Sequence, residues 1–188
     1  MPVQTCAVRM WLTSDDLERL EASARTPAAH RKAATTLTEW ADQEHPDDEV
    51  STAELLAAAG WHLDQAGDVE AALDLHRRAV AATGTTTPDA RCMLTAALLD
   101  AGRLDEARQV ANELRRAGPR IIDFASMAEV LEMHGDLVQA NRWAAMGVSR
   151  LQLATDTDEP EAWEVEILFD VRGRVRQELG FPPDDLDE

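Results

Sequence analysis

The chain has 188 residues, of which 45% are hydrophobic and 29% are charged, and its formal net charge is −18. This length and apolar content suffice for a continuous buried core. The excess of acidic side chains disfavours binding to nucleic acid or to an anionic membrane surface. No apolar run approaches the ~18 residues of a membrane-spanning helix, and the first residues lack the basic leader of a secretory signal. We therefore expect a cytoplasmic protein.

The N-terminal quarter contains irregular helical signals. A short helix can start at Thr13 or Ser14. A second can start at Thr26-Pro27, because proline is tolerated in the first turn of a helix. The apolar residues of the second helix recur at helical spacing and are Ala33, Leu37, Trp40 and Ala41. Residues 1–50 are thus predicted to form a lead-in and a degenerate helical hairpin.

A glycine-containing turn recurs three times between residues 51 and 153. The glycines are Gly67, Gly102 and Gly135, which lie 35 and 33 residues apart. Five residues after each glycine stands an alanine inside an apolar helical stretch, namely Ala72, Ala107 and Ala140. A fixed period of this size indicates stacked helix–turn–helix units. The sequence therefore predicts three such repeats over residues 51–153.

These repeats resemble tetratricopeptide repeats, a family written TPR below. Small residues that the family places in its first helices are present as Gly60 and Ala128. Arg91 departs from the family pattern because it stands at an expected core position. The resemblance implies an all-α, TPR-like α-solenoid, that is, a right-handed superhelix of antiparallel helix pairs.

The source of the chain is suggested by composition and by its last residues. Lys32 is the only lysine beside many arginines, which suggests a high-GC bacterium. Residues 174–185 resemble the C-terminal end of actinobacterial TPR-like proteins, some of which carry a cysteine-rich zinc module called SEC-C. That module is absent from this chain, so its metal is not expected here.

The C-terminal segment, residues 154–188, combines a linker, a helix and an acidic tail. The linker is the polar stretch 155–159, and Pro160 opens the helix. Apolar residues recur in that helix at four-residue spacing, namely Trp163, Ile167, Val171, Val175 and Leu179. We expect this helix to cap the stack. We further expect the segments 1–50, 51–153 and 154–188 to form one compact domain.

Recognised catalytic and cofactor-binding motifs are missing from the sequence. No two histidines stand three or four residues apart, the spacing that would let them share a metal on one helix face. Cys6 and Cys92 fit neither a disulfide nor a metal spacing. We therefore expect no catalytic, cofactor-binding or metal-binding residues and a protein that is not an enzyme. His76 is interpreted as an interior packing residue rather than as a pH switch.

The first helices of successive TPR-like pairs line a concave groove, and helical spacing predicts which side chains point into it. The groove pairs apolar residues with carboxylates, and the residues expected to bind a partner are Glu54, Trp61, Asp64, Asp89, Leu99, Ile122, Glu129 and Met133. The lysine, asparagine and arginine with which one TPR subclass grips a C-terminal carboxylate are replaced by Ala57, Trp61 and Ala96. The groove therefore favours a protein or peptide with apolar anchors and basic flanks.

The predicted function is that of a non-enzymatic protein–protein interaction scaffold. Two alternatives stay open at this point. The chain could be a regulatory or ligand-sensing domain that acts with a separate enzyme or transcription factor. It could also be an obligate homodimeric structural protein whose groove is buried by its twin, since exposed apolar strips usually find a partner. In either case the groove could instead be filled from within the chain, with Trp61 packed against the neighbouring hairpin or the C-terminal helix.

Overall fold

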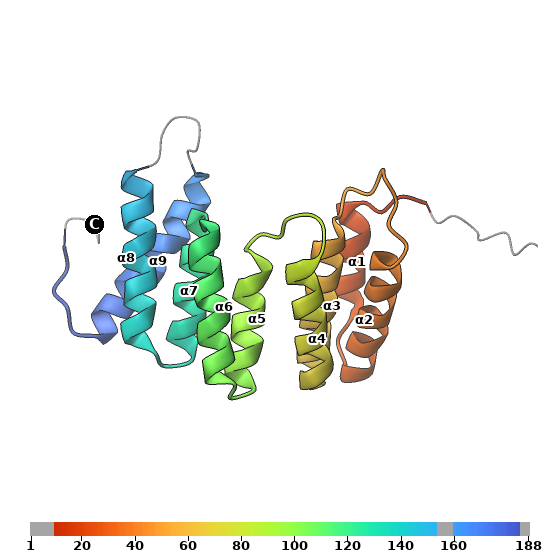
Figure 1. Cartoon of the computed structure of the whole chain (residues 1–188), viewed down its shortest axis with the longest axis horizontal. Coiled ribbons are helices and arrows are strands. Elements are labelled where there is room, and N and C mark those ends of the chain that lie inside the picture. Colours follow the sequence, from red (N-terminus) through yellow and green to blue (C-terminus); the bar gives the residue numbers. More distant parts are fainter. Residues whose placement is uncertain (1–9, 154–159, 185–188) are drawn as a thin grey trace, which may run out of the picture. The chain divides into compact units, whose positions relative to one another are not determined.

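The computed structural model describes residues 10–153 and 160–184, and every regular element within these ranges is an α-helix (Figure 1). The helices are α1 (Ser14–Ser23), α2 (Pro27–Ala41), α3 (Thr52–Ala66), α4 (Val69–Ala81), α5 (Ala90–Asp100), α6 (Leu104–Ala117), α7 (Ile121–Met133), α8 (Leu137–Gln152) and α9 (Ala162–Glu178). The all-α class predicted from the sequence is confirmed for this part of the chain. Within the same residues, no helix combines the length and the apolar character that crossing a membrane requires.

The chain divides into two compact units, Met1–Thr86 and Thr87–Glu188. This grouping differs from the sequence-based segments 1–50, 51–153 and 154–188, which were expected to form one domain. Helices α3 and α4, expected as the first of three repeats, belong to the first unit together with α1 and α2. The predicted linker 155–159 lies outside the described residues. So do residues 1–9 of the predicted lead-in, which include Cys6, and residues 185–188 of the predicted tail.

The first unit is built around α3, which packs against both α2 and α4. Helix α3 is buried on most of its surface because alanine and glycine let its neighbours approach closely. The largest fully buried apolar side chains of the unit are Leu37, Leu55 and Leu73, one from each of the three helices. Helix α1 contributes no buried residue. Just before α1, the Leu12 N–H donates to Asp48 Oδ1 at 2.7 Å.

The second unit contains the pairs α5/α6 and α7/α8, and α9 packs on both α7 and α8. Its core includes Leu114, Met127, Leu168, Val171 and Val175. A Cβ at Gly147 of α8 would lie 2.8 Å from the Leu168 side chain and 2.9 Å from Phe124 Cβ. The missing side chain at Gly147 therefore lets Leu168 of α9 enter between α7 and α8.

The predicted apolar stripe of α9 is only partly buried. Val171 and Val175 are fully buried, and Ile167 and Leu179 are half-buried against the core. Trp163, expected in the same stripe, is 46% exposed, and Leu168 is buried beside the stripe. The departure has a simple cause, since Trp163 lies in the first turn of α9, away from the buried middle of the helix.

The three glycine turns share one geometry, as their common period predicts. The backbone φ angles of Gly67, Gly102 and Gly135 are +77°, +70° and +75°. Each glycine N–H donates three residues back, and the next N–H donates five residues back, a pattern that closes a helix with a left-handed residue. The alanines that follow these turns, Ala72, Ala107 and Ala140, are buried where the two helices of each pair approach.

Candidate functional site

The residues predicted to line one groove belong to different units. Glu54, Trp61 and Asp64 lie in the first unit, and the other five lie in the second. The surface is therefore described separately for each unit.

Trp61 is the main exposed aromatic residue predicted for the groove, and its indole is 39% exposed. Its ring packs edge-on against His30 of α2 and His62 of α3, with centroid distances of 5.7 and 4.9 Å. The two histidines are joined through their Nδ1 atoms at 2.8 Å. An aromatic ring held on two sides loses little conformational freedom on binding, which suits a binding anchor.

His62 is fully buried beneath this exposed indole. Its burial lowers the pKa of the imidazole, and the neighbouring His30 acts in the same direction. No partner for His62 Nε2 lies within the described residues. His62 is therefore a neutral interior residue at pH 7 that supports Trp61 from below.

His76 is the other fully buried histidine of the first unit. Its Nε2 lies 2.7 Å from Asp64 Oδ2. The imidazole packs against Gly60, where a Cβ would lie 2.6 Å from two ring atoms. The structure thus places His76 as an interior packing residue, and it engages Asp64, one of the predicted groove carboxylates.

The other acidic residue predicted in the first unit is also engaged. The Glu54 carboxylate accepts from the Ser51 N–H at 2.8 Å and from the Ser51 hydroxyl at 2.7 Å. The Ser51 oxygen accepts in turn from the Glu54 N–H at 3.2 Å, which completes the capping box of α3. The Glu54 carboxylate therefore caps the N-terminus of α3, whether or not it also contacts a partner.

The predicted carboxylates of the second unit also have partners within the chain. Asp89 accepts from the Arg91 N–H and from its guanidinium, both at 2.9 Å. This ion pair explains how Arg91 occupies an expected core position, because its head reaches out to Asp89. Arg174 of α9 lies 3.4 Å from Glu129 and 2.9 Å from Glu132. A basic ligand would have to compete with these arginines.

The apolar residues predicted in the second unit are placed in three different ways. Ile122 is only 5% exposed and belongs to the interior. Leu99 is half-buried at the edge of the core. Met133, at the end of α7, is 73% exposed. Of the predicted apolar residues in this unit, Met133 is the most exposed, and the half-buried Leu99 offers a smaller surface.

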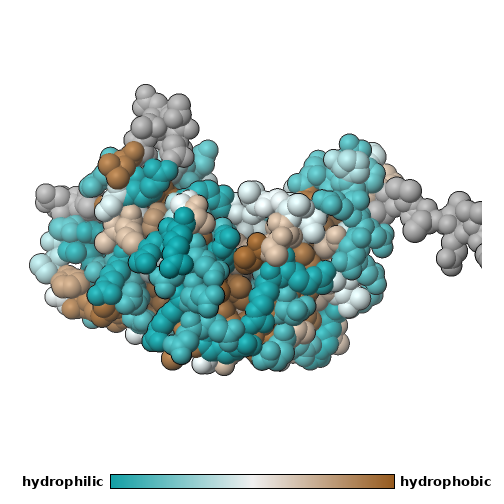
Figure 2. All heavy atoms as spheres, viewed as in Figure 1, coloured by the Kyte–Doolittle hydropathy of each residue, from teal (hydrophilic) through white to brown (hydrophobic). Residues whose placement is uncertain are grey.

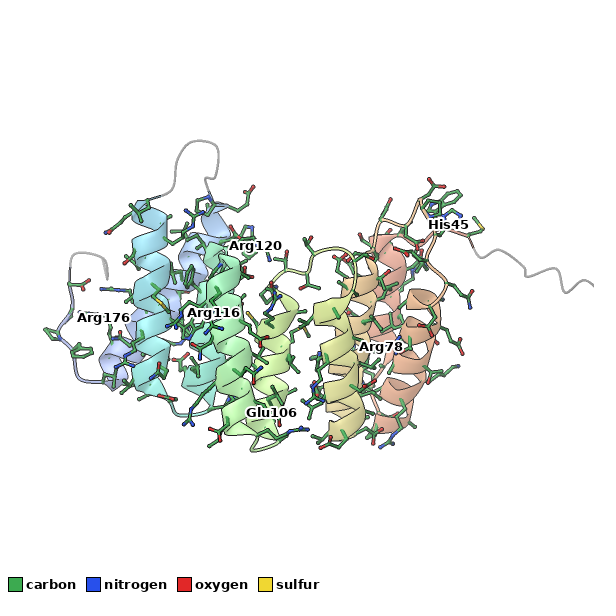
Figure 3. All side chains as sticks on the ribbon, viewed as in Figure 1. His45, Arg78, Glu106, Arg116, Arg120 and Arg176 are labelled. Carbon is green, nitrogen blue, oxygen red and sulfur yellow. The ribbon has the colours of Figure 1, made fainter. Side chains whose placement is uncertain are left out.

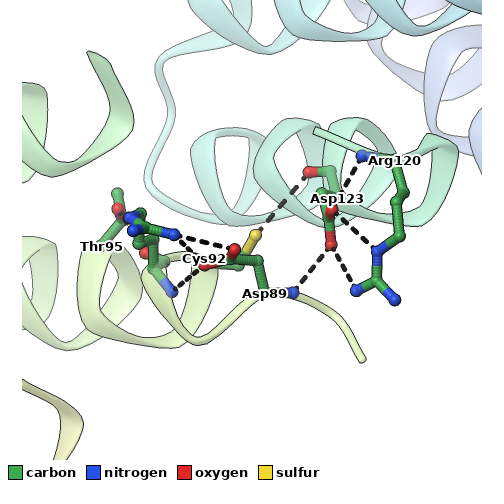
Figure 4. A network of polar contacts seen from close by, with 6 residues as sticks. Asp89, Cys92, Thr95, Arg120 and Asp123 are labelled. Carbon is green, nitrogen blue, oxygen red and sulfur yellow. Dashed lines mark hydrogen bonds and ion pairs between the residues drawn. The ribbon is translucent and has the colours of Figure 1, made fainter. Parts of the chain in front are cut away.

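A buried polar network that the sequence analysis did not anticipate joins the starts of α5 and α7 (Figure 4). Asp123 is 2% exposed and accepts from the Asp89 N–H at 2.7 Å. It also accepts from the Arg120 N–H at 2.8 Å and from the Arg120 guanidinium at 3.1 Å. The available signal was an acid three residues after the residue that precedes the helix, the spacing of a capping box.

Cys92 is a buried thiol beside this network, and its Sγ lies 3.7 Å from the Asp123 carbonyl oxygen. Burial raises the pKa of Cys92 far above its usual range, and the carboxylates of Asp123 and Asp89 act in the same direction. The thiol is therefore protonated at neutral pH. A protonated, buried thiol is neither a nucleophile nor a metal ligand.

A cleft of about 900 Å³ lies in the second unit between α6 and α8, with α5 and α7 at its base. The face shown in Figure 2 is largely hydrophilic, with smaller patches of less polar side chains. The residues facing the cleft come mostly from the second helices of the two pairs. The sequence analysis missed this cleft because it considered only the first helices.

A smaller cleft of about 530 Å³ lies in the first unit beside the loop that contains His45 (Figure 3). It is lined by Glu44, His45, Pro46, Asp48, Val50, Ser51, Thr52, Thr83 and Gly84. His45 Nδ1 lies 3.8 Å from the Asp47 carboxylate. Across residues 10–153 and 160–184, no three His, Cys, Asp or Glu side chains gather in a way that could hold a metal ion.

Comparison of the chain with protein-family models, with curated proteins and with solved structures gave no match. The TPR resemblance therefore rests on the repeated turns and on the small residues quoted above. The functional argument rests on the geometry of the surfaces just described.

Proposed function

We propose that the protein is a non-enzymatic protein–protein interaction module built from TPR-like helix pairs, with Trp61 as its central anchor. The supporting observation is that Trp61 is 39% exposed yet held edge-on by two histidines. Tryptophan is enriched among the residues that dominate binding energy at interfaces. The shared geometry of the turns at Gly67, Gly102 and Gly135 supports the TPR-like solenoid as the scaffold.

The proposed partner presents an apolar side chain to Trp61 and carries basic residues beside it. The predicted carboxylates near Trp61 are already engaged, Glu54 by Ser51 and Asp64 by His76. Their contribution to binding comes mainly through the field of the whole molecule, whose net charge is −18. Basic flanks should therefore speed association and make it sensitive to salt.

The proposal is tested by replacing Trp61. Proteins captured from source-cell lysate with the wild-type chain are identified, and the affinity of the purified partner is then measured. Trp61→Ala should weaken binding by about 2 kcal/mol, which corresponds to roughly 30-fold in Kd. Trp163→Ala is the matched control, because Trp163 is similarly exposed but lies on α9 of the second unit.

Equal affinities of the wild type and Trp61→Ala, both folded by circular dichroism, would remove Trp61 from the interface. An equal loss in Trp61→Ala and Trp163→Ala would indicate a general effect on the protein instead of an anchor.

The exposed indole also favours one alternative, self-association through the same surface. Solution mass measured across a range of protein concentrations separates the two. A dimer that dissociates in Trp61→Ala, with no captured partner, would assign the surface to a second copy of the chain.

A further inference from the structure

The cleft between α6 and α8 has an apolar base and a basic rim. Along α6 the residues that face it recur at helical spacing, and they are Leu104, Ala107, Arg108, Ala111, Asn112 and Arg115. Helix α8 adds Gln139, Arg142, Trp143 and Met146. Leu99 of α5 and Leu131 of α7 extend the apolar base.

The charge of this cleft is opposite to that of the whole chain, which has 36 acidic residues and 18 lysines and arginines. Three arginines line the cleft (Arg108, Arg115 and Arg142), and Asp136 is the one carboxylate among its lining residues. The Asp136 side chain is already engaged, since it accepts from the Gln139 N–H at 3.2 Å. The cleft is therefore a local basic site on an acidic protein.

The arginines are available to a ligand. Neither Arg115 nor Arg142 has an ion pair or a side-chain hydrogen bond with the residues that the structure describes. Arg108 pairs with Asp105 at 3.0 Å, but their side chains are 71% and 98% exposed. An ion pair this exposed is weak and is easily exchanged for another.

The length of the cleft and the spacing of its charges select the ligand class. Arg108 and Arg115 are seven residues apart on α6, which places them about 10 Å apart along the helix axis. The lining stretch from Leu104 to Arg115 spans about 16 Å, or three helical turns. Acids two turns apart on a helix have the same spacing as these two arginines, so both pairs can form at once without bending either side chain toward the other.

We propose that the cleft between α6 and α8 binds an acidic amphipathic helix from a partner protein. The apolar face of that helix packs on Leu104, which is 51% exposed, and on the half-buried Leu99 and Met146, in the manner of a helix in a groove. Its carboxylates pair with Arg108, Arg115 and Arg142. This site is independent of the Trp61 surface, whose proposed partner carries basic flanks.

The first experiment pans a display library of random peptides, each about 14 residues long, on the full-length wild-type chain. Enriched peptides should combine aspartate or glutamate with apolar residues spaced three and four apart. The informative peptides are those that lose enrichment on an Arg115→Glu/Arg142→Glu variant, since basic peptides held at the Trp61 surface should be retained by it. The proposal is overturned if no peptide loses enrichment on that variant, or if the peptides that do are neutral or basic.

The second experiment measures the affinity of an enriched, fluorescein-labelled peptide by polarisation. Arg115→Glu should weaken binding about tenfold, because charge reversal replaces an attraction by a repulsion. Arg116→Glu is the matched control, since Arg116 is the next residue on α6 and is exposed but does not line the cleft. It should change Kd less than threefold. Equal losses in the two variants would overturn the site.

Two further outcomes would reassign the cleft. An apparent molecular mass in solution that rises with protein concentration in the wild type but not in Arg115→Glu would assign the cleft to a second copy of the chain. Dodecanoate binding that depends on Arg115, with no peptide enriched, would assign it to a small apolar carboxylate. A failure at this cleft leaves the Trp61 experiment unaffected, because the two tests use different residues and different ligands.

Discussion

At the scale of single residues, two helical glycines are present for different reasons. Gly60 of α3 leaves room for the buried His76 ring, and a Cβ there would lie 2.6 Å from ring atoms. The ring cannot move away freely, because it is fully buried and bound to Asp64. Gly173 of α9 has nothing within 4 Å of the position of a Cβ. The TPR resemblance marks Gly60 as a position for a small residue, but only the tertiary structure shows that His76 fills the space beside it.

Alanine substitutions at the two glycines should have opposite effects on the free energy of unfolding. Gly60→Ala should destabilise the protein by about 1–2 kcal/mol, since overpacking outweighs the gain in helix propensity. Gly173→Ala should stabilise it by up to about 1 kcal/mol through propensity alone. Urea denaturation measures both, and a stabilised Gly60→Ala variant would refute the packing role of His76.

The buried His62 should make stability depend on pH below neutrality. Its pKa is lowered in the folded protein, so the unfolded chain binds a proton at a higher pH than the folded one does. Stability is therefore fully present above about pH 6.5, the unperturbed value for histidine. It falls as the pH decreases through 6.5 toward the folded pKa.

The measurement compares the free energy of unfolding at pH 7.5 and 5.5 in the wild type and in His62→Asn. The difference between the two pH values should be smaller in His62→Asn. Ser149→Ala, at an exposed position that carries no titratable side chain, should retain the wild-type difference. An unchanged difference in His62→Asn would assign the pH dependence to other groups.

At the scale of the elements, helix starts are connected by side chains far apart in sequence. Asp123 caps α7 and also accepts from the Asp89 N–H, at the start of α5. One buried carboxylate therefore sets the position of two helices. Arg120 complements its charge at the same site.

Asp123→Asn should destabilise the protein by about 2–3 kcal/mol. The amide is neutral, and its NH₂ group cannot accept the bonds that one carboxylate oxygen accepts now, which leaves buried donors unpaired. Asp105→Asn, at a side chain that is 98% exposed, should change stability by less than about 0.5 kcal/mol. Urea denaturation distinguishes them, and similar values for the two variants would contradict the importance of the network.

At the scale of the whole molecule, the chain forms two compact units that meet in sequence at Thr86 and Thr87. We expect the effects of core substitutions to stay within their own unit. Asp123→Asn should speed amide hydrogen exchange in α5–α9, and Gly60→Ala should speed it in α2–α4. Mass spectrometry of the exchanged peptides measures this, and acceleration spread evenly over both ranges by either variant would show a single cooperative unit.

The sequence by itself determined the all-helical class and the three glycine turns. Helices and turns follow from residues within about five positions of one another, so a periodic pattern and a glycine are sufficient signals. The turns predicted at Gly67, Gly102 and Gly135 are present in the structure, and so is the predicted C-terminal helix, α9.

Only the tertiary structure decided which of the predicted groove residues are free to meet a partner. Asp89 and Glu129 pair with arginines, Ile122 enters the core, and Trp61 rests on His30 and His62. Periodicity also did not predict the basic cleft, because its lining arginines come from two helices, Arg115 from α6 and Arg142 from α8. The Glu129–Arg174 pair spans 45 positions and the His30–His62 contact spans 32, and such pairings depend on how helices pack and not on local periodicity.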